Sequence, residues 1–251
     1  DSGGQSIADG QWLVFSDMTN NASGGAVFLQ QGAEFSLLPE NETGMTLFAN
    51  NTVTGEYNNG GAIFAKENST LNLTDVIFSG NVAGGYGGAI YSSGTNDTGA
   101  VDLRVTNAIN NIANDGKGGA IYTINNDVYL SDDVFNNNQA YTSTSYSDGD
   151  GGAIDVTDNN SDSKHPSGYT IINNTAFTNN TAEGYGGAKY NKNTAAPHLF
   201  FIFFFESHSQ NRGGVVDEDK KSGGEGEGAS PAAGGGVFFW LKWRYLCFCC
   251  G

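Results

Sequence analysis

The sequence predicts an all-β chain. Its main part, residues 10–190, is expected to form a right-handed parallel β-helix (β-solenoid) of about six coils, followed by an irregular C-terminal tail. Two observations carry this prediction. The tripeptide Gly-Gly-Ala recurs six times with second glycines 27 to 36 residues apart, and short stretches of alternating apolar and polar residues lie between the copies. A repeated period indicates stacked units, and alternation with period two indicates half-buried strands. Helix-pair repeats of similar length need a 3.6-residue apolar period and few glycines, which these segments lack.

The second glycine of each copy is expected at a tight corner, where a positive φ or a close backbone approach excludes a side chain. A ladder of six such glycines is predicted: Gly25, Gly61, Gly88, Gly119, Gly152 and Gly187.

Two residue files should follow each Gly-Gly-Ala, because neighbouring residues of a strand point to opposite faces. The first residue is expected to point into the core with the alanine, and the second to point outward in an aromatic file. The inward file contains Ile63, Ile90, Ile121 and Ile154, with Lys189 as a departure. The outward file contains Phe28, Phe64, Tyr91, Tyr122 and Tyr190, with Asp155 as a departure.

A second motif, Phe-x-x-Asn, lies upstream of each Gly-Gly-Ala except the first. Its phenylalanine is replaced once, at Ala108, and the first copy, Phe15 to Met18, keeps the phenylalanine and loses the asparagine. We expect the asparagines to form an amide ladder in which each carboxamide hydrogen-bonds to its neighbour along the axis. The five members are Asn51, Asn81, Asn111, Asn138 and Asn180.

Between the motifs run alternating stretches such as Phe35-Ser-Leu37, Leu71-Asn-Leu73 and Val128-Tyr-Leu130. We therefore expect each unit to contain three short strands separated by Gly- or Asn-rich corners. One unit cannot bury its apolar row alone, whereas stacked units pair every strand with the coil above and below.

The charge of the chain excludes several kinds of partner. The 251 residues carry 11 Lys and Arg against 27 Asp and Glu, a formal charge of −16. Binding to nucleic acid phosphates or to anionic membrane surfaces requires clustered basic residues, so neither partner is expected.

The longest apolar runs, residues 199–205 and 237–250, are too short for a transmembrane helix.

The composition changes near Ala188. Residues 1–188 carry −17 and residues 189–251 carry +1, and the three cysteines all lie in the last five residues. We treat residues 191–251 as an irregular low-complexity tail that is disordered or frame-shifted, with Gly223–Gly236 as its most disordered stretch. The alternative is a degenerate seventh repeat at Gly213-Gly214-Val215.

No catalytic or cofactor site is predicted. Residues 1–188 hold one arginine and one histidine and no recognisable catalytic constellation. The Asp132-Asp133 pair is expected to serve a turn or a solvated edge, because adjacent strand residues face opposite ways. Asp148 and Asp150, two residues apart in a Gly-rich loop, are weak calcium candidates, and a flexible acidic corner loop is the competing interpretation.

The two alternating motifs resemble the paired tetrapeptide repeats of the chlamydial polymorphic outer-membrane proteins and of similar adhesin-like proteins, over about residues 15–190. The resemblance implies an autotransporter-type passenger displayed at the outer membrane or cell surface, or released, and used for adhesion. In that family a C-terminal β-barrel would be the membrane anchor. Residues 189–251 show no run of alternating ten-residue strands, so the anchor is expected to be missing.

The predicted function is therefore adhesion to host or neighbouring surfaces, through an unknown surface receptor or glycan and without an active site. The alternative is a secreted β-helix that binds or cleaves polysaccharides, as pectate lyases do. A cleaving enzyme would need basic residues to neutralise uronates or to act as the base, and the repeats are poor in them. A surface-layer spacer is a third possibility.

Overall fold

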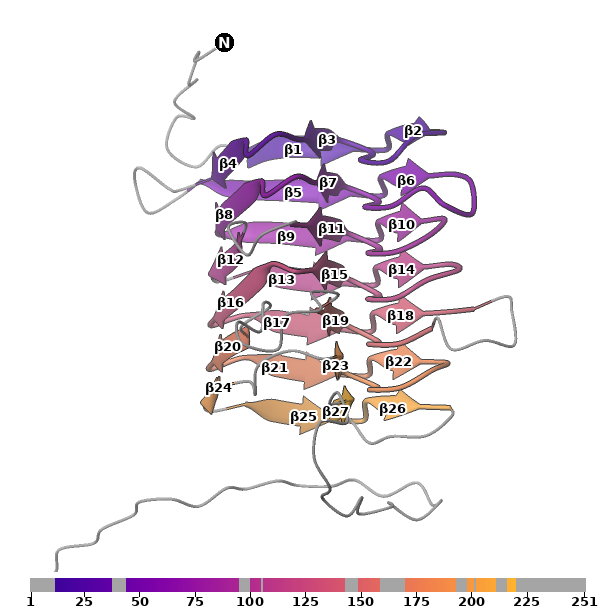
Figure 1. Ribbon diagram of the computed structural model, residues 1–251. Helices are drawn as coiled ribbons and strands as arrows, with labels where there is room; N and C mark the ends of the chain where they lie inside the picture. Colours follow the sequence, from indigo (N-terminus) through magenta and orange to yellow (C-terminus); the bar gives the residue numbers. More distant parts are fainter. Residues whose placement is uncertain are drawn as a thin grey trace, which may run out of the picture.

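The chain is a stack of coils, each made of four short strands (Figure 1). The computed structural model describes residues 12–37, 44–94, 100–104, 106–142, 149–158, 170–192, 198–200, 202–210 and 216–219. All regular elements in these ranges are β-strands. The predicted parallel β-helix is confirmed.

The strands form four parallel sheets, which we call sheets A to D. Sheet A contains β1 (Trp12–Ser16), β5 (Met45–Ala49), β9 (Val76–Ser79), β13 (Asn107–Ile109), β17 (Val134–Asn136), β21 (Ala176–Thr178) and β25 (Phe203–Phe205). Sheet B contains β2 (Thr19–Asn20), β6 (Thr52–Val53), β10 (Val82–Ala83), β14 (Ile112–Ala113), β18 (Gln139–Ala140), β22 (Thr181–Ala182) and β26 (His208–Ser209). Sheet C contains β3 (Val27–Leu29), β7 (Ile63–Ala65), β11 (Ile90–Ser93), β15 (Ile121–Ile124), β19 (Ile154–Thr157), β23 (Lys189–Lys192) and β27 (Val216–Asp219). Sheet D contains β4 (Glu34–Leu37), β8 (Thr70–Thr74), β12 (Ala100–Arg104), β16 (Asp127–Ser131), β20 (Thr170–Asn173) and β24 (His198–Phe200).

Each coil therefore has one strand more than the three expected. The additional strand belongs to sheet B and is two residues long. It directly follows the Asn corner, and its second residue is the small residue, such as Ala83 or Ala113, that recurs two positions after the asparagine. A strand this short leaves no alternating pattern for sequence reasoning to detect.

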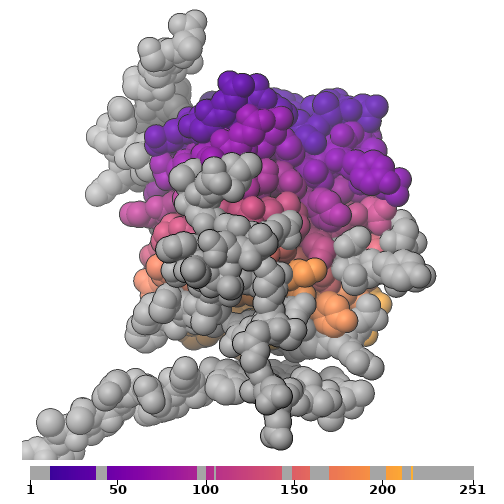
Figure 2. Space-filling model, viewed as in Figure 1, coloured from indigo at the N-terminus to yellow at the C-terminus, as the bar shows by residue number. Residues whose placement is uncertain are grey.

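The coils stack in strict register, so that each motif residue lies over its counterpart. Ile63, Ile90, Ile121 and Ile154 are successive partners in sheet C. In the space-filling view the colour changes along the stack from indigo at the top to orange at the bottom, as expected for coils stacked in sequence order (Figure 2). Parallel in-register pairing gives every strand the hydrogen-bond partners that an isolated unit lacks.

The interior of the stack is apolar and closely packed. The four isoleucines above are at most 1% exposed. In sheet A the motif phenylalanines form two stacks of three rings, with centroids 4.7 to 5.3 Å apart, interrupted by the buried Ala108. The stacks consist of Phe15, Phe48 and Phe78, and of Phe135, Phe177 and Phe204.

The solenoid continues beyond residue 190, which differs from the predicted domain boundary. Strands β24 to β27 pair with the preceding coil, so three sheets have seven strands instead of about six. Phe204 stacks on Phe177, and Ser207 accepts a hydrogen bond from the Asn180 amide N–H at the position of the ladder asparagine. Val216 is the partner of Lys189, so Gly213 to Val216 align with Gly-Gly-Ala-Ile. The degenerate seventh repeat is thus supported at its strand, while residues 211–215 and Gly223–Gly236 lie outside the described residues.

Within the described residues there is no helix long and apolar enough to span a membrane.

Candidate functional surfaces

A buried amide ladder runs along the corner between sheets A and B. All five motif asparagines are fully buried. Nδ2 of each donates to Oδ1 of the next, at 2.9 to 3.0 Å, from Asn51 to Asn180. The second hydrogen of each Nδ2 goes to a backbone carbonyl of the preceding coil, and each Oδ1 also accepts the backbone N–H of the preceding ladder residue, for example from Asn81 to Asn111. Every interior carboxamide therefore uses both donors and accepts two bonds, which satisfies its hydrogen-bonding capacity.

The residue before each ladder asparagine has a left-handed backbone and an exposed side chain. Its φ is 54° at Asn50, 57° at Asn110 and 54° at Asn137. Asparagine and glycine tolerate this conformation best, and Gly80 occupies the same position with φ 64°. We call these residues the corner file; Asn137 Nδ2 donates to Asn110 Oδ1 at 2.7 Å within it. The sequence already contained the signal, because four ladder asparagines directly follow another asparagine.

The two glycines of the Gly-Gly corner have different structural roles. The first has a positive φ, for example 67° at Gly118. The second lies against the next coil, because a Cβ on Gly119 would be 2.1 Å from the Gly152 carbonyl oxygen. The same contact recurs at Gly25, Gly61, Gly88 and Gly152 at 2.0 to 2.1 Å, while a Cβ on Gly187 would meet His208 backbone atoms at 2.4 Å.

The outward file of sheet C is only partly exposed. Phe28, Phe64 and Tyr91 stack with centroids 4.8 to 5.2 Å apart, and Phe28 is 51% exposed. Tyr122 and Tyr190 are buried instead, because Tyr86 and Tyr185 from the turns after β10 and β22 pack against them.

Asp155, the departure from this file, belongs to a buried charged cluster. Lys117 Nζ forms an ion pair with Asp150 Oδ2 at 2.8 Å and lies 5.8 Å from the centre of the Tyr190 ring. Asp155 is fully buried, and burial raises the pKa of its carboxyl to about 7 although Lys117 opposes the shift. Asp150 Oδ1 also accepts the Tyr185 N–H, so this calcium candidate is engaged within the protein. Asp148 lies outside the described residues, among which no group of three metal-ligating side chains occurs.

Asp132 and Asp133 have opposite environments and do not share a site. Asp132 is exposed, and hydrogen bonds from Asn174 and Ser131 lower the pKa of its carboxyl. Asp133 is 1% exposed, its Oδ1 accepts the Thr106 N–H at 2.7 Å, and its Oδ2 has no hydrogen-bond partner in the described part of the chain. Burial raises the pKa of Asp133 to about 8.

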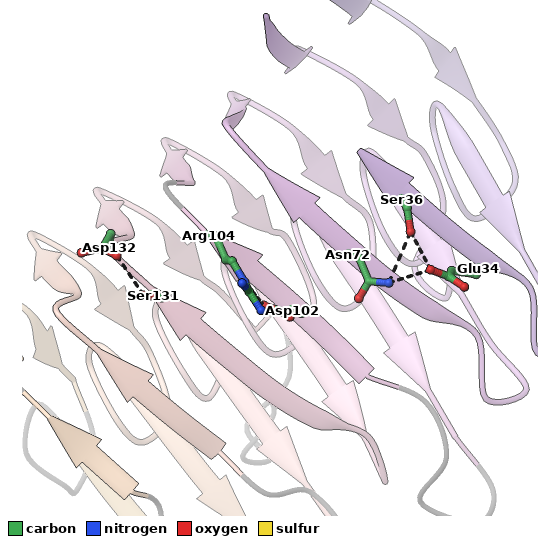
Figure 3. A network of polar contacts seen from close by, with 7 residues as sticks. All are labelled: Glu34, Ser36, Asn72, Asp102, Arg104, Ser131 and Asp132. Atoms are coloured by element: carbon green, nitrogen blue, oxygen red, sulfur yellow. Dashed lines mark hydrogen bonds and ion pairs between the residues drawn. The ribbon is translucent and has the colours of Figure 1, made fainter. Parts of the chain in front are cut away.

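The outer face of sheet D is polar and carries a row of hydrogen-bonded side chains (Figure 3). Asn72 Nδ2 donates to Glu34 Oε1 at 2.8 Å and to Ser36 Oγ at 3.3 Å. Farther along the stack, Arg104 donates two hydrogen bonds to the Asp102 carboxylate, from Nε to Oδ1 at 3.2 Å and from Nη2 to Oδ2 at 3.0 Å. A shallow groove crosses β12, β16 and β20 on this face.

The outer face of sheet A has a different character, which sequence reasoning missed. None of its seven strands contains a charged residue. The residue before each motif phenylalanine points outward and is mostly apolar, and Val14, Val134 and Phe203 are 50%, 37% and 52% exposed. Reading the position before Phe-x-x-Asn across the repeats would have found this row.

Comparison with known proteins agrees with the repeat architecture. Residues 46–66, 75–93 and 134–157 match the Chlamydia polymorphic membrane protein (Chlamydia_PMP) repeat. Each matched segment contains ladder or corner residues described above. The fold and its ladders thus define a Pmp-type repeat solenoid.

One curated relative gives a more particular assignment. Over 199 residues, 78% of the chain, the sequence is 88% identical to a protein of Escherichia coli (strain K12) described as a probable autotransporter, YfaL. The chain spans 16% of that relative's length. No solved structure matches. The matched repeats and this relative support an autotransporter passenger with Pmp-type repeats, located at the cell surface or outer membrane.

Proposed function

We propose that this passenger is an adhesin that attaches its cell to host or neighbouring surfaces through the outer face of sheet A. The observation that carries the proposal is the outer row of seven in-register strands, which is uncharged and apolar except at Asn107, on a chain of charge −16. Contiguous exposed apolar surface is uncommon on soluble proteins and marks contact sites.

The geometry of the face supports attachment to a second surface. Seven coils at about 4.8 Å spacing extend the row over about 30 Å. The strands are held by backbone pairing along their length, so the face is presented without conformational cost on binding. An acidic protein is repelled by most cell-surface components, which are themselves often anionic, and a neutral face avoids this repulsion.

The partner that fits this face is an apolar patch on a surface protein. Val14, Val134, Phe203 and Phe205 present side chains without hydrogen-bonding groups, so they offer area and shape. Binding by this face should therefore depend weakly on salt.

Retention of protein-coated beads under flow tests the proposal. Beads carrying the full chain are settled on cultured epithelial cells and on bacterial cells, and the bound fraction is counted after washing. The double variant Val14→Asp, Val134→Asp should lose most of the binding, because it places two carboxylates in the apolar row. The control, Ser36→Asp with Asn72→Asp, adds the same charge to sheet D outside the groove and should bind like the parent.

Equal retention of the sheet A variant and the parent would contradict the proposal. Release of sugar fragments from any polysaccharide by the purified chain would also contradict it and would favour the polysaccharide-cleaving alternative.

A further inference from the structure

The groove on the outer face of sheet D has the chemistry of a sugar-binding site. Its wall is built from two in-register files on β12, β16 and β20. One file consists of Asp102, Tyr129 and Ile171, and the other of Arg104, Ser131 and Asn173. The groove therefore has an apolar middle at Tyr129 and Ile171 and a hydrogen-bonding rim on one side.

The Tyr129 ring is held in place at this apolar middle. Its hydroxyl donates to Asp127 Oδ2 at 3.1 Å, and the side chain is half-buried on the outer face. A tyrosine fixed in this way offers a rigid apolar surface at low entropic cost. Ile171, its partner on β20, continues that surface by one coil.

The rim can donate and accept hydrogen bonds while carrying little net charge. Arg104 is 63% exposed at its side chain and is neutralised by its bidentate pair with Asp102. A guanidinium has five N–H groups, and only part of them faces Asp102, so the others are available to a ligand. Ser131 and the exposed Asn173 add a hydroxyl and a carboxamide.

The charge around the groove selects against anions. Asp127 and Asp132 flank it, and the repeat region carries −17. The guanidinium of Arg104 is already paired, so a carboxylate or sulfate on a ligand would meet net negative potential.

We propose that this groove binds an uncharged glycan, a chain of neutral sugars lying along the coil axis. A pyranose ring has apolar C–H faces and hydroxyls at its edge, which match the apolar middle and the polar rim. Because the coils repeat at about 4.8 Å, each of the three strands presents one residue of each file to successive units of a linear polymer. The inference concerns a different face from the adhesive row of sheet A, and it stands independently of the adhesion proposed there.

A glycan array tests the inference. The full-length chain is applied to an array that contains neutral mannans, glucans and chitin oligomers beside uronate-bearing and sialylated glycans. The parent should bind neutral glycans and ignore the anionic ones. Tyr129→Ala should weaken binding at least about tenfold through loss of the apolar surface. Arg104→Ala, an exposed change that preserves the fold, should weaken it several-fold. Tyr129→Phe keeps the ring and should retain most of the binding.

Asn72→Ala lies on the same face outside the groove and should bind like the parent. The Val14→Asp, Val134→Asp variant should also keep glycan binding while losing bead retention, which separates the two proposals. A parent chain that binds no neutral glycan, that prefers anionic ones, or whose binding is unaffected by both Tyr129→Ala and Arg104→Ala would overturn the inference.

Discussion

Two adjacent residues at the corner between sheets A and B, often both asparagine, have different roles. Asn110 is exposed with φ 57°, whereas Asn111 is fully buried with all its hydrogen-bonding groups occupied. The corner file accepts Asp17, Gly80 and Glu206, while the ladder keeps asparagine in five successive coils. A residue type is thus required where its polar atoms have no alternative partners and is replaceable where water can serve.

The Gly-Gly corner offers the largest test of this difference. Gly119→Ala should cost more than about 4 kcal/mol of stability, since its Cβ would lie 2.1 Å from the Gly152 carbonyl oxygen in a stack that cannot separate. The measurement is the thermal midpoint by far-UV circular dichroism. Gly32→Ala is the control: its Cβ meets nothing within 4 Å, so only the strain of its φ of 71°, about 1 kcal/mol, should appear. Similar losses from the two variants would show that close approach between coils does not govern the corner.

Removing one ladder amide should have the next largest effect. Asn111→Ala leaves the Asn81 N–H and Nδ2 without their acceptor and removes the donors to Asn138 Oδ1 and the Phe78 carbonyl. Stranding these buried groups should cost about 3 kcal/mol. Urea unfolding of the variant beside Asn110→Ala gives the comparison. This change removes an exposed amide and places alanine at a φ of 57°, which together should cost about 1 kcal/mol. Equal destabilisation of the two neighbours would refute the division between ladder and corner file.

Replacing a buried polar group that lacks part of its hydrogen bonds should, unlike Asn111→Ala, stabilise the protein. Burial raises the pKa of Asp133 to about 8, so the folded state keeps a proton that the unfolded state releases above its ordinary pKa. Stability from this group is present at low pH and is lost as the pH rises toward 8. Asp133→Asn should therefore be more stable than the parent by about 2 kcal/mol at alkaline pH, with the difference shrinking in acid.

The neighbouring Asp132→Asn supplies the matched control for that pH series. Hydrogen bonds lower the pKa of this exposed carboxyl, so its contribution is present above its ordinary pKa and is lost as the pH falls. Relative to the parent, Asp133→Asn should gain stability as the pH rises, whereas Asp132→Asn should lose stability. An Asp133→Asn curve parallel to that of the parent at alkaline pH would be inconsistent with a buried protonated carboxyl.

The smallest effect is expected in the corner file itself. Asn110→Gly should change stability by no more than about 0.5 kcal/mol, because glycine adopts a positive φ freely and Gly80 already occupies this position one coil earlier. A melting curve that overlays the parent is the expected outcome. A loss as large as that of Asn111→Ala would place the Asn110 side chain among the structural contacts.

Sequence reasoning reached the stacked architecture because the Gly and Asn positions are fixed by backbone geometry and buried hydrogen bonds, which permit few substitutes. It missed the fourth strand, since two residues carry no period. It ended the solenoid too early because Ser207 stands where the ladder has asparagine, which leaves the motif that begins at Phe204 incomplete. The burial of Tyr122 also escaped prediction, because it depends on Tyr86, which lies outside both motifs. Outer faces follow no motif, and their character emerges only when the strands are aligned in register.

The spacing of the ladder explains how such a molecule can diversify. Asn111 and Asn138 are 27 residues apart and Asn138 and Asn180 are 42 apart, yet the amide bonds joining them are 3.0 and 2.9 Å long. The ladder thus keeps its register although the number of residues between its members changes. Mutation can therefore lengthen the chain between two ladder positions while the scaffold is inherited unchanged.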